Sequence, residues 1–204
     1  MTIRIPTDDT GRRAPRPAPL PRAGTWPGLA AGAWGLLFAV PSLVWAMGFS
    51  FGARTTVAPS LVKLADDRVT WFVAVLWLTG LLKILGALIG IGLTRRRGRW
   101  TGRLLALSGA GAAVLLAWHG AVFVVHGTLV ETGARAVAPD LAGLTRWYLC
   151  LWGPWFLAGG ALFAAATLRY VRRLDPCAGA RLFGAVGALG ATFLSLLSTV
   201  TGIG

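Results

Sequence analysis

Five strongly apolar stretches run through this chain of 204 residues, and arginine clusters fill alternate gaps between them. A hydrocarbon core about 30 Å thick requires roughly 20 apolar residues of helix, and a segment in lipid must satisfy its own backbone polar groups. We therefore predict transmembrane helices at about residues 28–51, 69–93, 104–127, 147–168 and 182–203. The fifth stretch is rich in Gly, Ser and Thr, so four spans are the alternative if it is not inserted.

The charge content supports the same fold class. Only 13% of the residues are charged, against about 25% in a typical soluble domain. The net charge of +13 does not indicate nucleic-acid binding, because the basic residues lie in short gaps between apolar spans rather than on one domain face. The prediction is an all-α, polytopic transmembrane helical bundle, with residues 26–204 as one domain and the lipid bilayer as its main partner.

The basic residues also predict an orientation. Fourteen of them lie in the N-terminal region, the second gap and the fourth gap, and five lie in the other gaps. Lys and Arg are enriched in cytoplasmic loops, so we expect a multi-pass protein of the cytoplasmic membrane with its N-terminus inside and its C-terminus outside. Residues 1–25, rich in Arg and Pro, are expected to form a disordered cytoplasmic tail.

Lys83 is the main anomaly, because it lies about two residues from the middle of the second predicted span. A lysine at that depth costs about 2.5–3.5 kcal/mol on insertion scales and marks a candidate functional site. The alternative is a structural lysine, either neutral or hydrogen-bonded to carbonyls freed by Pro41. The predicted spans contain no Asp or Glu to act as a counter-charge.

His119 lies in the outer half of the third predicted span. Together with Lys83, Trp77 and Trp118, it defines a candidate intramembrane polar site, proposed from depth alone. His119 and His126 are the only histidines and lie seven residues apart on one helix, so they cannot ligate one haem iron from opposite sides. We expect no metal site and no cofactor, although a haem or redox protein remains a third class of function.

Two prolines are candidate hinges or kinks, since proline removes a helical hydrogen bond. Pro41 lies near the middle of the first predicted span, and Pro154 lies in the outer half of the fourth. No phosphate-binding loop, HExxH, CxxC or GxSxG pattern is present. The expectation is therefore that the protein is not an enzyme.

Two segments carry a resemblance. The first is Leu43-Val-Trp45-Ala-Met-Gly48, and the second runs from Trp152-Gly-Pro-Trp155-Phe-Leu-Ala-Gly159-Gly160 to Arg169-Tyr-Val-Arg172-Arg173. They resemble an uncharacterised family of small bacterial integral membrane proteins that has a Trp-Ala-x-Gly motif in its first span. The resemblance implies a small helical bundle in a bacterial membrane, and it implies no reaction, substrate or catalytic residue.

Two functions follow from these observations. The first is an integral membrane protein with a structural or partner-binding role, working as a homo-oligomer or with another membrane protein. The alternative is a small transporter or permease component that binds a polar or anionic solute near Lys83.

Overall fold

The structure is a computed structural model that describes residues 24–174 and 178–201. The expected N-terminal tail lies outside the described residues, apart from Gly24 and Thr25.

Five helical segments in the described part of the chain are long and apolar enough to cross a membrane. They are α1 (Trp26–Ala46), α4 (Thr70–Gly92), α5 (Arg99–Glu131), the continuous segment Leu141–Arg172, and α8 (Ala178–Thr201). Each agrees with one of the spans predicted from hydropathy. The C-terminal helix α8 meets the same criteria as the others, which favours five spans over four.

The observed helix ends differ from the predicted ones for local reasons. Helix α1 stops at Ala46, five residues before the predicted end, because Gly48 takes a φ of 103°, which favours glycine and does not continue a right-handed helix. Helix α5 extends past its apolar part at both ends, from Arg99 to Glu131. A hydropathy pattern does not report these polar helical turns.

The fourth segment consists of three successive pieces. Helix α6 (Pro139–Trp147) leads into a π-helical turn, η1 (Tyr148–Trp152), which leads into α7 (Gly153–Arg172). Pro154 is the second residue of α7 and follows the π-helical turn almost directly. Its missing N–H and its ring both affect the carbonyl of Cys150, four residues earlier and inside that turn. Pro41 lies inside a helix that continues through it. The roles of both prolines as hinges stay predictions.

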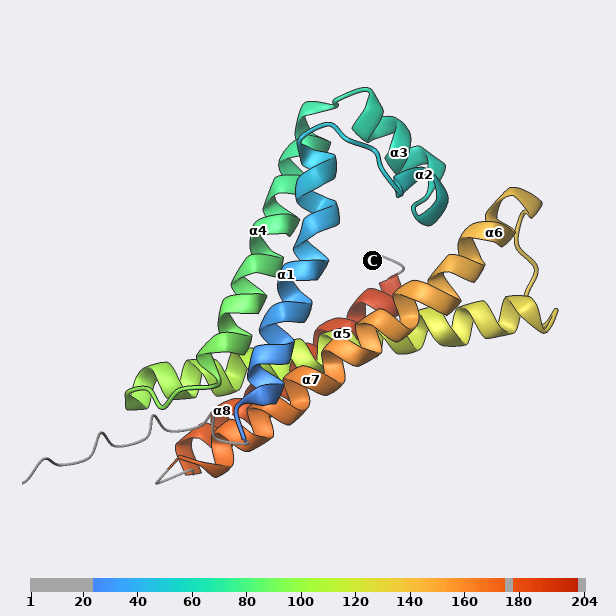
Figure 1. Ribbon diagram of the computed structural model, residues 1–204. Helices are drawn as coiled ribbons and strands as arrows, with labels where there is room; N and C mark the ends of the chain where they lie inside the picture. The colour runs from blue at the N-terminus through green and yellow to red at the C-terminus, as the bar shows by residue number, and fades with distance from the viewer. Residues whose placement is uncertain (1–23, 175–177, 202–204) are drawn as a thin grey trace, which may run out of the picture.

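The helices form two groups that diverge from one end of the molecule (Figure 1). Helices α1 and α4 pack against each other as one antiparallel pair, and α5 packs against both α7 and α8 in the second group. The contact between α1 and α7 joins the groups. The resulting order of neighbours is α4, α1, α7, α5, α8.

Glycines allow these helices to approach closely. A Cβ atom at Gly90 would lie 2.7 Å from the backbone nitrogen of Gly32, and one at Gly160 would lie 2.9 Å from the backbone nitrogen of Ala117. A Cβ atom at Gly187 of α8 would overlap the carbonyl oxygen of Leu107 of α5. Close backbone packing of this kind holds helices together in lipid, where apolar side chains gain little from leaving the solvent.

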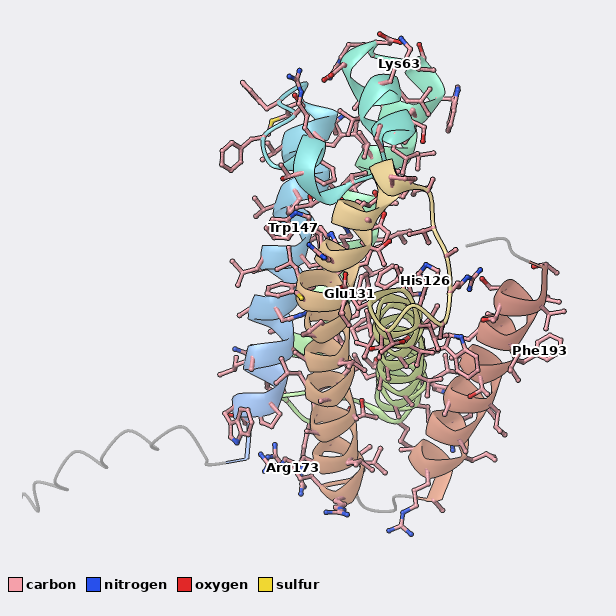
Figure 2. All side chains as sticks on the ribbon, turned by 90° about the vertical axis from the view of Figure 1, so that its right-hand side faces the viewer. Lys63, His126, Glu131, Trp147, Arg173 and Phe193 are labelled. Carbon is pink, nitrogen blue, oxygen red and sulfur yellow. The ribbon has the colours of Figure 1, made fainter. Side chains whose placement is uncertain are left out.

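Large apolar side chains cover the outside of the bundle. In Figure 2, Phe193 projects from α8 on the side away from the other helices, and 66% of its surface is exposed. Leu81, Leu85 and Leu88 on α4 are also more than half exposed. A water-soluble monomer rarely presents apolar surface on this scale, so the described chain forms a transmembrane helical bundle with its apolar surface toward lipid.

Two short helices, α2 (Ala53–Thr56) and α3 (Pro59–Asp66), connect α1 to α4. The indole nitrogen of Trp152 in η1 donates a hydrogen bond to the carbonyl oxygen of Thr56, at 3.0 Å. This bond ties the first long connection to the π-helical turn, so the two groups also meet away from the end where they diverge.

Candidate functional site

Lys83 lies in a cavity of about 370 Å³ between the two groups of helices. Thr79, Lys83 and Gly86 bring one face of α4 to this cavity because they recur at helical spacing. Opposite them, Trp34 and Phe38 enter from α1. The remaining wall consists of Gly35, Leu82, Ala112, Leu115, Leu116 and Phe163. We call this space the Lys83 cavity.

The amine of Lys83 makes two contacts across the α1–α4 pair. Its Nζ donates a hydrogen bond to Ser42 Oγ at 2.7 Å, and it lies 3.7 Å from the centroid of the Phe38 ring. A cation over an aromatic face gains about 0.5–2 kcal/mol, with the larger values where water is excluded. Ser42 is only 4% exposed, so its hydroxyl is held in place for this bond. The bonded group is a hydroxyl next to Pro41, rather than one of the carbonyls considered from the sequence.

No carboxylate accompanies the amine within the described residues. The three ion pairs in this part of the chain are Arg54–Asp66, Lys63–Asp67 and Arg146–Glu131, all outside the Lys83 cavity. An ammonium group has three hydrogens to donate, and Ser42 accepts one of them. The amine therefore retains capacity for an acceptor brought in by a ligand.

Aromatic rings form a rigid wall behind Lys83. Trp34 lies 5.1 Å from Phe38 and 5.6 Å from Trp155 between ring centroids, and its indole nitrogen donates to the Trp155 carbonyl oxygen at 3.0 Å. Phe163, only 2% exposed, meets Trp34 edge-on. Such ring pairs add about 0.5–1.5 kcal/mol each beyond burial. The wall is thus fixed in shape, which suits binding of a ligand to a preformed site.

His119 and Trp118 lie in a different cavity, of about 550 Å³, between α5 and α8. There the Trp118 indole nitrogen donates to Thr199 Oγ1 at 3.0 Å. The His119 ring lies 5.5 Å from that of Phe156, which in turn lies 5.1 Å from Phe38. The structure therefore does not bring His119 and Lys83 into one site, although ring contacts connect them.

Trp77 is 43% exposed and lines neither of these two cavities. Conversely, Ser42, Phe38 and Trp34 contact or surround Lys83 and did not follow from the sequence argument. They recur every four residues on α1, so a stripe on one helical face was the available signal. Its aromatic members looked like ordinary apolar residues of a span.

Metal ligation has no candidate in the described part of the chain, where no group of three His, Cys, Asp or Glu side chains comes together. The polar groups at the Lys83 cavity are one amine, the buried hydroxyl of Ser42 and the hydroxyl of Thr79, and the remaining described lining is mainly apolar. This combination can bind and orient a molecule that carries an acceptor group.

The fold and the cavity define the class: a polytopic helical membrane protein with an amine in an intramembrane cavity. The chain belongs to the DUF3995 family of proteins of unknown function, whose match covers residues 35–163. The match includes Lys83, Ser42 and Phe38, and it runs from α1 into α7. No curated protein and no solved structure matches the chain significantly.

Proposed function

We propose that this protein binds an amphipathic molecule from the membrane, with the acidic head group of the ligand on Lys83 and its hydrocarbon part along the aromatic wall. The observation that carries the proposal is the Lys83 amine, which binds Ser42 and lies over the Phe38 ring in a cavity whose described lining is mainly apolar. The proposed role is binding, and not enzymatic catalysis.

The charge of Lys83 indicates the chemistry of the ligand's head group. A cation at this depth without a carboxylate is costly, and an anionic group beside it would reduce that cost. The bond from the ammonium group to the Ser42 hydroxyl has a charge on the donor alone. A carboxylate would place an opposite charge on the acceptor and add Coulombic attraction, which is stronger away from water. A carboxylate or a similar acid is therefore the best match for the amine.

The lining of the Lys83 cavity indicates that the rest of the ligand is apolar. Thr79 lines the cavity, but its Oγ1 already donates a hydrogen bond to the Leu76 carbonyl oxygen at 3.0 Å. A small, fully hydrophilic anion would lose its hydration there and gain little beyond the amine. A hydrocarbon chain loses nothing by leaving lipid for this cavity. The geometry thus favours an amphiphile over the polar solute considered from the sequence.

Access is proposed from the lipid, between α4 and α5. These helices approach each other near the loop that joins them, where Leu105 faces Gly92 and Leu93 faces Gly109, and they diverge from there (Figure 1). The Lys83 cavity lies along the divergent part, between Leu82 and Gly86 on one side and Leu115 on the other. A membrane-dissolved ligand could enter sideways without crossing water.

We also propose that the protein resides in the bacterial cytoplasmic membrane with its N-terminus inside. The start of α1, the α4–α5 loop, the end of α7 and the start of α8 lie at the same end of the molecule (Figure 1). In the sequence, 14 of the 18 arginines lie in or next to the loop and the α7–α8 connection, or in the segment before α1. That distribution supports the orientation through the preference of cationic loops for the cytoplasm. A homo-oligomer or a membrane partner remains the proposed context for a bundle of this size.

The test uses the fact that the chain has two lysines, Lys63 and Lys83. Purified protein in neutral detergent is titrated with dibrominated stearic acid or with its methyl ester, and binding is followed by bromine quenching of tryptophan fluorescence. Trp34→Phe identifies the part of the signal that arises in the cavity. Lys83→Met should weaken binding of the acid by about tenfold or more and leave binding of the ester unchanged.

Lys63→Met is the matched control, because Lys63 lies in α3 and is paired with Asp67 on the surface. It should leave both affinities unchanged. Equal binding of acid and ester by the unmodified protein would refute the proposal. Loss of folding in Lys83→Met would instead assign Lys83 a structural role through the Ser42 bond.

A further inference from the structure

A second cavity, of about 580 Å³, lies at the end of the molecule where the arginine-rich loops gather. Three separate segments form it, and its lining residues are Thr25, Thr94, Arg95, Arg96, Tyr170 and Arg173. We propose that this cavity, here called the arginine cavity, binds a phosphate group, carried either by the head group of an anionic lipid or by a soluble phosphate compound. The proposal is independent of the Lys83 cavity.

Local packing brings the three segments together. Gly28 at the start of α1 leaves room for the methyl group of Thr94, since a Cβ atom at Gly28 would lie 2.7 Å from it. Leu93, just before Thr94, is buried in one cluster with Tyr170 of α7. The ends of α4 and α7 are therefore anchored in the same buried cluster, together with α5, and the arginines that follow each end line a common space.

The charged residues that line the arginine cavity are positive. Among the described residues that line it, three of six are arginines and none is acidic. The ion pairs among the described residues involve none of these arginines. Guanidinium groups present paired donors that match two phosphate oxygens. An anion with several oxygens could therefore engage more than one of them at once.

The preference of arginines for the cytoplasmic side of a membrane does not account for the environment of Tyr170. Its side chain is 2% exposed, and its hydroxyl group is buried with no hydrogen-bond partner among the described residues. The hydroxyl group lies on the side of Tyr170 that faces Gly102 of α5. One guanidinium nitrogen of the adjacent Arg169 is also buried without a hydrogen-bond partner among the described residues, but that guanidinium lies over the Trp26 ring and outside the cavity lining. Buried polar groups are nearly always satisfied, so the Tyr170 hydroxyl, which belongs to a residue of the cavity lining, is a donor that lacks an acceptor. A bound phosphate, directly or through water, would supply one.

The depth of the arginine cavity fits a membrane interface. Trp26 and Trp100, at the same end of the bundle, are 54% and 70% exposed, and exposed tryptophans mark the head-group region. Basic pockets between helices at this level bind anionic lipid head groups. A phosphate at this position would connect α1, α4 and α7 through one set of charges.

The experiment measures thermal unfolding of the purified full chain in neutral detergent by tryptophan fluorescence, at constant ionic strength. The probes are phosphatidylglycerol in mixed micelles, sodium phosphate, and phosphatidylcholine as the neutral lipid control. Arg173→Gln should weaken the binding of the active probe by about tenfold or more. Arg172→Gln is the matched control, because it removes the same charge from an exposed residue outside the cavity lining, and it should change the affinity less than threefold.

Tyr170→Phe separates a binding role from a structural one. Removing an unsatisfied buried hydroxyl should raise the unfolding temperature without ligand and reduce the further rise that the probe produces. A response to phosphatidylglycerol alone identifies a lipid, and a response to sodium phosphate identifies a soluble ligand; either supports the proposal. Equal losses in Arg172→Gln and Arg173→Gln, or equal responses to both lipids without a response to phosphate, would overturn it. If Arg173→Gln does not fold, an undiminished probe response in Tyr170→Phe decides against the proposal.

Discussion

The close approach of α5 and α7 at Gly120 gives a quantitative prediction for the substitution Gly120→Ala. A Cβ atom at Gly120 would lie 2.8 Å from the carbonyl oxygen of Gly153 and 2.8 Å from the backbone nitrogen of Leu157. Optimal separations between heavy atoms are about 3.5–4.0 Å, and neither backbone atom can rotate away. The two helices would have to separate by more than half an ångström, and overpacking of this kind costs about 1–3 kcal/mol.

Alanine also favours helix over glycine by about 1 kcal/mol, so a matched control is needed. Gly190→Ala on α8 provides it, because a Cβ atom there would have no other atom within 4 Å. We expect Gly120→Ala to be about 1–3 kcal/mol less stable to unfolding than Gly190→Ala, measured by reversible denaturation in mixed micelles. Equal stability of the two variants would show that α5 and α7 do not approach as closely as described.

Two indole hydrogen bonds give further predictions. Trp152→Phe removes the donor to the Thr56 carbonyl oxygen and should cost about 0.5–1.5 kcal/mol; faster hydrogen exchange at residues 53–66 should accompany it, and unchanged exchange there would contradict it. Trp118→Phe removes the donor to Thr199 Oγ1 and should cost about 0.6 kcal/mol, the average for such bonds in a membrane. Its effect should be confined to exchange over residues 191–201, and a uniform loss of protection would argue against a local role.

The membrane fold could be predicted because hydropathy depends on composition over a long window. The uncharged run around Lys83 identified α4 despite the lysine, and the Gly- and Ser-rich run at 182–203 identified α8. The π-helical turn at Tyr148–Trp152 could not be predicted in this way, because hydropathy does not report how a helix is hydrogen-bonded; Pro154, just after it, was the local signal of a disturbed helix. The end of α1 depends on one dihedral angle at Gly48.

The candidate site was predictable only in part. Lys83 could be selected because a charge in a span is rare, whereas His119 and Trp118 were grouped with it by depth. Depth does not define the direction in which a side chain points, and the structure places those two residues between α5 and α8. Ser42 and Phe38 became recognisable as partners of Lys83 only when the packing of α1 on α4 was known.

The pairing of α1 with α4 has a consequence for biogenesis. These are consecutive spans, and they pack along much of their length through positions such as Gly32, Gly35 and Gly90. The hairpin can therefore assemble while the later spans are still being translated. The α5–α7–α8 group would then pack against the α1–α4 hairpin after that hairpin has formed, and the Lys83 cavity would form only at that second stage.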